Sequence, residues 1–150
     1  MTEDEKIKIE PEFNRALNIW HEDKPLEAIN ILKKLDENFP NHYVISFTLS
    51  AIYHDLEIWQ QTLKYSKKAV AFSPKSESAS IILFHSLFNL KKYQEAFDEI
   101  KRFLAIASIN NKPLKEYDLL IRDWKKDLNL ATDNYSEIIE SVFQNITSQS

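Results

Sequence analysis

The chain has 150 residues, a length that suits one domain able to bury most of its apolar surface without cross-links. It contains no cysteine and no glycine, which excludes disulfides, thiolate metal sites and glycine-rich phosphate loops. The net charge of −4 argues against nucleic acid as the main ligand. The first residues lack the pattern of a signal peptide, and no apolar run approaches a membrane span. We therefore expect a cytoplasmic protein that binds neither nucleic acid nor membrane.

The first predicted pair of helices occupies about residues 9–42. Apolar residues at spacings of three and four, beginning at Phe13, predict its first helix. Pro25, preceded by Asp23 and a lysine, predicts the start of its second helix, because proline is well placed in a first turn. Pro40 ends this helix and leaves Asn41 as the expected cap of the next one.

The pattern then returns at an offset of 34 residues, which predicts two more pairs at about 43–76 and 77–110. A proline at position 74 and Ser76 mark the boundary between them, with Ser76 as the expected helix cap. In each second helix a small residue precedes a large apolar one: Ala28 and Ile29, Thr62 and Leu63, and Ala96 and Phe97. In each first helix the corresponding apolar residues are Phe13, Phe47 and Ile81, followed by Ile19, Tyr53 and Leu87.

These residues resemble the tetratricopeptide repeat (TPR), whose pattern is W-x2-L-G-x2-Y, then A-x3-F, then P. The second repeat matches best, through Leu49, Ser50, Tyr53, Thr62, Ala69 and Pro74, and the third through Leu83, Tyr93, Ala96 and Phe103. The first repeat departs at Glu12 and Arg15. The resemblance covers about residues 9–110. It implies an all-α fold, a right-handed α-solenoid of about eight helices that forms a single domain over residues 1–150.

The family's small glycine in each first helix is replaced here by Ala16, Ser50 and Phe84. Because Phe84 is much larger than glycine, we expect looser or rearranged packing around it.

Two further helices are predicted after the third repeat, at about 113–128 and 133–147. Asn111-Lys112-Pro113 is a start signal for the first of them, and each carries an apolar stripe. We interpret the pair as a cap, because the terminal units of a solenoid must cover the open end of its core. The alternative is that the last helix folds back toward the groove or joins two copies of the chain in a homodimer.

The sequence offers no catalytic, cofactor-binding or metal-binding constellation. None of the four histidines, His21, His42, His54 and His85, has a second histidine three or four residues away, as two ligands on one helix face would require. Nucleophilic catalysis lacks both a cysteine and a serine in a glycine elbow. We therefore expect a protein that is not an enzyme and needs no cofactor.

The TPR resemblance implies that the first helices line a concave groove that binds a partner. Carried over position by position, the groove residues are Phe13, Leu17, Trp20, Val44, Phe47, Ala51, His54, Ser78, Ile81, His85 and Phe88. Such an apolar, aromatic-rich surface suits an apolar helix or extended segment. The alternative is that these aromatic residues only pack between helices or are covered by the termini.

The resemblance also predicts one kind of partner that the chain does not bind. TPR proteins that read the acidic C-terminal tails of chaperones use a clamp of Lys, Asn and Arg. The matching positions here hold Phe13, Leu17, Thr48, Ser78 and Ile82. We therefore expect no recognition of such tails.

Together these features predict a protein–protein interaction module with one dedicated partner. The more specific hypothesis is a bacterial immunity protein that neutralises a cognate toxin domain. One alternative is a TPR-type secretion chaperone that holds an apolar segment of a client protein. Another is a structural adaptor that associates with itself.

Overall fold

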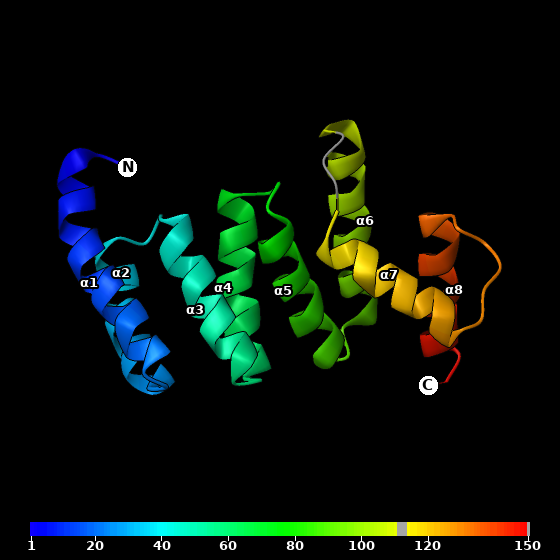
Figure 1. Ribbon diagram of the computed structural model, residues 1–150, viewed down its shortest axis with the longest axis horizontal. Helices are drawn as coiled ribbons and strands as arrows, with labels where there is room; N and C mark the ends of the chain where they lie inside the picture. The colour runs from blue at the N-terminus through cyan, green and yellow to red at the C-terminus, as the bar shows by residue number, and fades with distance from the viewer. Residues whose placement is uncertain (111–113, 150) are drawn as a thin grey trace. The chain divides into compact units, whose positions relative to one another are not determined.

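The computed structural model describes residues 1–110 and 114–149, with the backbone alone at 108–110. The predicted start signal Asn111-Lys112-Pro113 lies outside these residues. The described part contains eight α-helices, as the sequence predicts (Figure 1): α1 Glu3–His21, α2 Pro25–Asn38, α3 Tyr43–Asp55, α4 Trp59–Phe72, α5 Glu77–Asn89, α6 Tyr93–Asn110, α7 Glu116–Asp127 and α8 Tyr135–Thr147. None of these helices combines the length and apolar character needed to cross a membrane.

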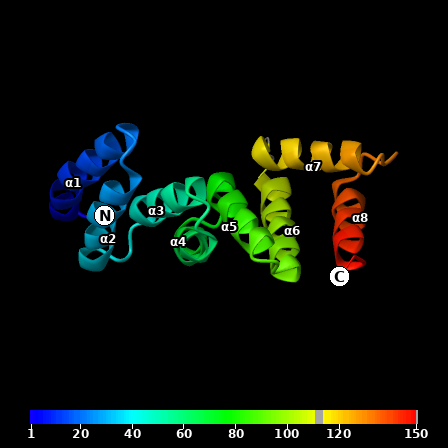
Figure 2. The same ribbon diagram turned by 90° about the horizontal axis from the view of Figure 1, so that it is seen from below.

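The chain divides into two compact units, residues 1–73 and 74–150, with α1 to α4 in the first and α5 to α8 in the second. Within each unit, consecutive helices pack in pairs, and we call the first helix of a pair its A helix and the second its B helix. In the first unit α1 and α3 form one layer and α2 and α4 the other (Figure 2). The predicted single domain over residues 1–150 stays a prediction.

The turn inside each helix pair has the same backbone geometry. One residue takes a positive φ: Asp23 at 63°, Glu57 at 57°, Lys91 at 62° and Asn129 at 52°. In the first pair the Asp23 N–H donates to the Trp20 carbonyl, and the next N–H donates to the carbonyl of Ile19. The same two bonds recur in the other three pairs, which makes each turn a Schellman motif. The glycine-free sequence thus places ordinary residues where this motif favours glycine.

The Asn129 turn shows that α7 and α8 form a fourth helix pair, joined by the same type of turn as the other three. Thirty-four residues separate the turn residues of the first three pairs, whereas thirty-eight separate Lys91 from Asn129. Within the second unit, α7 packs against α5 and α8 packs against both α7 and α6. Among the described residues, the large exposed hydrophobic side chains lie on other elements than α8. The role of this pair as a cap stays a prediction.

Two of the predicted helix starts agree with the structure, and one prediction is wrong. Pro25 is the first residue of α2, and the Ser76 hydroxyl accepts the Ala79 N–H of α5 at 3.1 Å. Asn41 does not cap α3, because it lies in the turn with Pro40 and the extended His42 takes the cap position, without a side-chain bond. Helix α1 begins at Glu3, before the predicted repeat start at residue 9, because Thr2 caps it.

The repeating small residues of the B helices are fully buried, which lets the A and B helices of each pair approach closely. Ala28, Thr62 and Ala96 are each 0% exposed, and the Thr62 hydroxyl donates to the Ile58 carbonyl at 2.9 Å. One cluster of buried residues in the first unit contains Ile9, Ala16, Ala28, Ile29, Leu32, Leu35, Ile45, Leu49, Ile52, Tyr53 and Tyr65.

Around Phe84 the packing is rearranged rather than loose. This buried ring lies within 5.7 to 6.3 Å of the rings of Phe88, Phe97, Tyr117 and Trp124. These rings come from α5, α6 and α7, and Phe143 of α8 joins them through Phe97 at 5.2 Å. The volume that glycine would leave free therefore holds the centre of an aromatic cluster, which fixes the C-terminal helix pair to the third.

Candidate partner-binding surface

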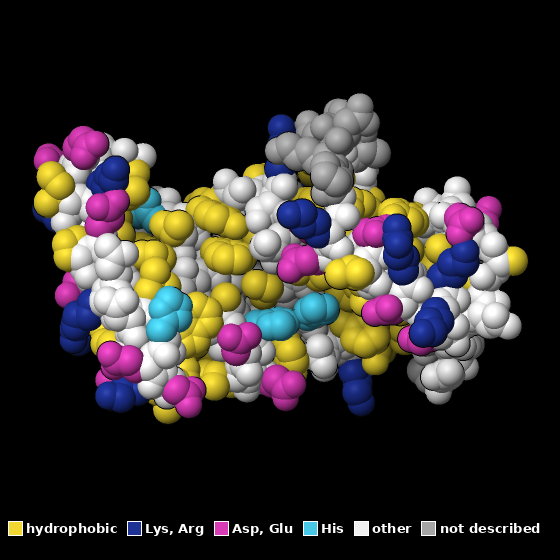
Figure 3. All heavy atoms as spheres, viewed as in Figure 1, with side chains coloured by type: hydrophobic (Ala, Val, Ile, Leu, Met, Phe, Trp, Pro, Cys, Tyr) yellow, Lys and Arg dark blue, Asp and Glu magenta, His cyan; other side chains and the backbone are white. Residues whose placement is uncertain are grey.

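The A helices of the first unit present an apolar face. On α3, Val44 is 42% exposed, and Phe47, Ala51 and His54 are half-buried. The hydroxyls of Thr48 and Ser50 donate to carbonyls of their own helix, at 2.7 and 2.6 Å, so they do not make this face polar. Figure 3 shows hydrophobic side chains gathered over α3. Part of this face is therefore exposed within the first unit.

On α1 the predicted residues serve both the core and the surface. Phe13, Leu17 and Trp20 are all half-buried, and Phe13 and Trp20 pack against the core of the first unit. Their exposed parts continue the apolar face of α3, while their buried parts hold α1 in place. The aromatic rings of Phe13 and Trp20 are therefore partly core, as in the alternative interpretation, and partly exposed.

In the second unit the four predicted residues differ in exposure. Ser78 is exposed, and His85 and Phe88 are half-buried. The Phe88 ring packs against Tyr93 at 5.3 Å as well as against the aromatic cluster. Ile81 is 8% exposed and belongs to the core. The predicted surface on α5 thus consists mainly of Ser78, His85 and Phe88.

The fourth helix pair adds a residue that the sequence analysis did not assign. Counting back ten residues from the Asn129 turn, Leu119 of α7 stands at the position that Phe13, Phe47 and Ile81 hold before their own turns, and it is 64% exposed. In the sequence it lies beside the apolar stripe of its helix rather than on it. The shared turn geometry is the signal that reveals the equivalence.

The comparisons with known proteins agree with this arrangement. The structure is similar to "MamA 41-end from Desulfovibrio magneticus RS-1", with a TM-score of 0.59 and 19% sequence identity, over 72% of this chain and 59% of that chain. It is as similar to the "MamA RS-1 ArsTM double mutant", with the same TM-score, identity and coverage of this chain, over 58% of that chain. MamA is a TPR-repeat protein. The fold is that of TPR helix pairs. The predicted all-α, TPR-like fold is therefore confirmed.

Protein-family models and curated proteins give no match to this sequence. The chain spans about three fifths of the length of the MamA chains, so their similarity describes the fold of the shared part.

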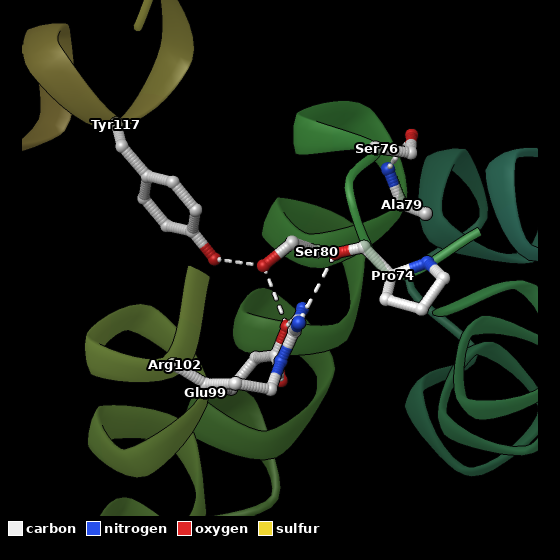
Figure 4. Close-up of polar contacts among 7 residues, drawn as sticks. All are labelled: Pro74, Ser76, Ala79, Ser80, Glu99, Arg102 and Tyr117. Carbon is white, nitrogen blue, oxygen red and sulfur yellow. Dashed lines mark hydrogen bonds and ion pairs between the residues drawn. The ribbon is translucent and has the colours of Figure 1, made fainter. Parts of the chain in front are cut away.

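A buried polar network fixes the TPR pairs of the second unit (Figure 4). The Ser80 hydroxyl donates to a Glu99 oxygen at 2.6 Å, and Arg102 donates to both oxygens of the same carboxylate at 2.8 and 2.7 Å. Arg102 also donates to the Pro74 carbonyl at 3.0 Å. The hydrogen bond to Glu99 raises the pKa of Arg102. Because its polar groups form hydrogen bonds with one another, we interpret the network as structural.

The start of α7 is held by a carboxylate from α5. Glu77 accepts the backbone N–H groups of Lys115 and Glu116 at 3.1 Å, and that of Tyr117 at 3.4 Å. Lys115, the cap residue of α7, makes no side-chain cap bond, so Glu77 takes that role from another helix. This contact sets the position of the fourth pair beside the third.

The histidines predicted near the groove have ring and carboxylate neighbours. His54 packs edge-on against Trp59 at 5.5 Å and lies 3.8 Å from Asp55, and His21 stacks on Trp20 at 6.3 Å. Over residues 1–110 and 114–149, no three His, Asp or Glu side chains gather as a metal-binding group. A scaffold of this type is typically non-catalytic.

Two hollows lie in the second unit, at places that the sequence analysis did not indicate. One, of about 590 Å³, lies between α6 and α8 and is lined by Lys101, Leu104, Ala105, Ser136, Glu137, Ile139 and Glu140. The other, of about 450 Å³, lies between α7 and α8 and is lined by Asp118, Ile121, Arg122, Lys125, Asp133, Tyr135 and Ile138. In the second hollow, Asp118 and Asp133 are already paired with Arg122 and Lys125.

Proposed function

We propose that this chain is a non-enzymatic module that binds one dedicated protein partner through the faces of its A helices. The observation that carries the proposal is the apolar face of the first unit, where Val44 is 42% exposed beside the half-buried Phe47 and Trp20. Aromatic side chains that are partly exposed at a rigid surface are typical anchors of protein interfaces.

The TPR-like fold supports this class of function, because stacked helix pairs present extended surfaces to protein partners. In the second unit, Ser80, Glu99 and Arg102 pair with one another in a structural network. The chemistry that the structure offers is therefore shape and apolar contact. We expect the module to act in the cytoplasm and to ignore the acidic tails of chaperones.

The specific role we propose first is inhibition of a cognate toxin domain by masking it, as an immunity protein does. The alternative is a secretion chaperone that holds an apolar client segment, and a third is a self-associating adaptor. An inhibitor forms a complex with a folded domain and abolishes its activity. A chaperone instead keeps an isolated segment soluble, and an adaptor changes its own mass with concentration in light scattering.

Affinity capture from the native cell followed by mass spectrometry tests the proposed function. We expect one partner in stoichiometric amount with the wild type, and its loss with Phe47→Glu. The matched control is Leu26→Glu on α2, because Leu26 is also an exposed hydrophobic residue of the first unit, at 66%, but lies on a B helix. Its complex should survive.

Two results would contradict the proposal. One is capture of no stoichiometric partner under several conditions. The other is equal loss of the partner with both variants while circular dichroism shows that both remain helical. The variant His85→Glu tests whether the second unit also contributes to partner binding, because His85 is half-buried on α5. If Phe47→Glu and His85→Glu unfold the chain, the two residues belong to the core.

A further inference from the structure

We propose that the A-helix face of the first unit binds an apolar segment that also carries Lys or Arg residues, and that these cations lie at the edge where α1 and α3 end. This inference rests on the proposed function and specifies the chemistry of the partner. It follows from two observations: the middle of this face has no Lys or Arg, and its edge at the A–B turns carries exposed carboxylates.

The middle of the face contains no cationic Lys or Arg. Helix α3 carries one Asp and no Lys or Arg, and its surface residues are Val44, Phe47, Ala51 and His54. On α1, Lys6 and Lys8 lie in the first two turns of the helix, where Lys6 is 3.8 Å from Glu10. Arg15 is two residues from Phe13 and so does not share its side of the helix, and it lies 2.9 Å from Glu12. An incoming apolar segment therefore meets no cation there.

The edge formed by the two A–B turns of this unit is acidic. Exposed carboxylates follow the end of each A helix: Glu22 and Asp23 after α1, and Asp55 and Glu57 at the end of α3. The one Lys or Arg within these turns is Lys24. Figure 3 shows acidic side chains along the lower edge of the first unit. By contrast, the corresponding turn of the third pair holds Lys91 and Lys92.

Charge complementarity then determines the sign of the charge that the partner segment carries at this edge. In the proposed complex, a segment that buries apolar residues on Phe47 and Trp20 runs along the A helices and reaches the four carboxylates of this edge. Cationic residues there gain from the field of the carboxylates and speed association, whereas acidic residues are repelled. Since these carboxylates are exposed, each contributes modestly, and their sum gives the selectivity.

The first test uses two synthetic amphipathic peptides with the same leucine spacing, one with lysine and one with glutamate at its polar positions. Titration of the full chain, followed by the fluorescence anisotropy of a labelled peptide, should show binding of the lysine peptide at least about tenfold tighter than binding of the glutamate peptide. Equal binding of the two peptides, or preference for the glutamate peptide, would overturn the inference.

Matched variants show whether the lysine peptide occupies this face or only follows the net charge. Asp55→Asn combined with Glu57→Gln should weaken binding several-fold, since each exposed pair is worth about two- to fivefold. Asp4→Asn combined with Glu37→Gln removes the same charge at the start of α1 and the end of α2, away from the A–B turns, and should leave binding unchanged. Equal losses in both double variants would mean nonspecific attraction and contradict the proposed site.

A pair of substitutions within the face gives the second test. Ala51 is half-buried on α3, and Ala51→Lys and Ala51→Glu add side chains of similar length and opposite charge. We expect Ala51→Lys to reduce binding of the lysine peptide about tenfold more than Ala51→Glu does. The reverse order would overturn the inference. A natural partner that binds this face through an acidic segment would also refute it, while leaving the proposed interaction module intact.

Discussion

The hydroxyl of Tyr117, on α7, lies 2.8 Å from the hydroxyl oxygen of Ser80, on α5. The single proton of Ser80 is donated to Glu99, so Tyr117 must donate in the bond that joins the two hydroxyls. Tyr117 is fully buried, and burial raises the pKa of its hydroxyl. This bond links the fourth helix pair to the third through polar groups that have no access to solvent.

The direction of these bonds predicts unequal effects of two substitutions. Tyr117→Phe removes one donor and leaves Ser80 bonded to Glu99, so it should cost about 1 kcal/mol of unfolding free energy. Ser80→Ala leaves the buried Tyr117 hydroxyl unpaired and should cost about 2–3 kcal/mol. The double variant should cost less than the sum, because the unpaired hydroxyl is then gone. Urea unfolding measures all three, and equal costs of the single variants would refute the assigned directions.

Ser46, in the middle of α3, has a buried hydroxyl with no hydrogen-bond partner in the described structure. A hydroxyl in this state costs free energy, and alanine also favours the helix. We therefore expect Ser46→Ala to stabilise the chain by about 1 kcal/mol. Thermal unfolding measures the change. A loss of stability would mean that the hydroxyl has a partner that the structure does not show, such as a buried water.

The positive-φ turns predict stabilising glycine substitutions. Glu57 and Lys91 are exposed and hold φ values of 57° and 62°, which cost a non-glycine residue about 1–2 kcal/mol. Part of this gain is lost to the greater freedom of glycine in the unfolded chain, so each change should add about 0.5–1 kcal/mol. Asn129→Gly is the control, because asparagine tolerates this conformation and should show little change. A destabilised Glu57→Gly variant would contradict the turn geometry.

Stability at alkaline pH should depend on Tyr65. Burial, with a further contribution from Asp36, raises the pKa of Tyr65 from 10.0 to about 12. The folded state therefore keeps this proton longer than the unfolded state does, so the stabilisation is complete below pH 10 and is lost as pH rises to about 12. In urea unfolding, Tyr65→Phe should lose less stability over this range than the wild type. Parallel losses would show that other groups, such as lysines, cause the whole effect.

The sequence predicts the three first helix pairs well because the same buried positions return every 34 residues, as at Ala28, Thr62 and Ala96. The fourth pair does not follow the 34-residue spacing, since thirty-eight residues separate Lys91 from Asn129, so the spacing does not predict it. The spacing of apolar residues indicates which positions are buried. The Schellman turn that defines the pair is a property of the backbone, and here Asp, Glu, Lys and Asn all occupy its positive-φ position.

The candidate surface shows a similar division. Of the groove residues that the TPR resemblance predicts, Val44 is 42% exposed and Phe47 is half-buried, whereas Ile81, at the position equivalent to Phe47 in the third pair, is 8% exposed. The difference arises because packing with neighbouring helices decides exposure, and the large Phe84 rearranges that packing. The binding role of these groove residues stays a prediction. The network of Ser80, Glu99 and Tyr117 was equally invisible, since it joins three helices through side chains far apart in the sequence.

The central claim is that a protein partner covers the A-helix face of the first unit. Because the chain has no cysteine, Val44→Cys and Leu26→Cys each provide a single reactive thiol, one on the A-helix face and one on α2. The rate of maleimide labelling, measured with and without saturating captured partner, reports which face is covered. We predict that the partner slows labelling of Val44→Cys at least about tenfold and leaves Leu26→Cys unchanged. Protection of Leu26→Cys alone, or of neither thiol while the partner is bound, would contradict the claim.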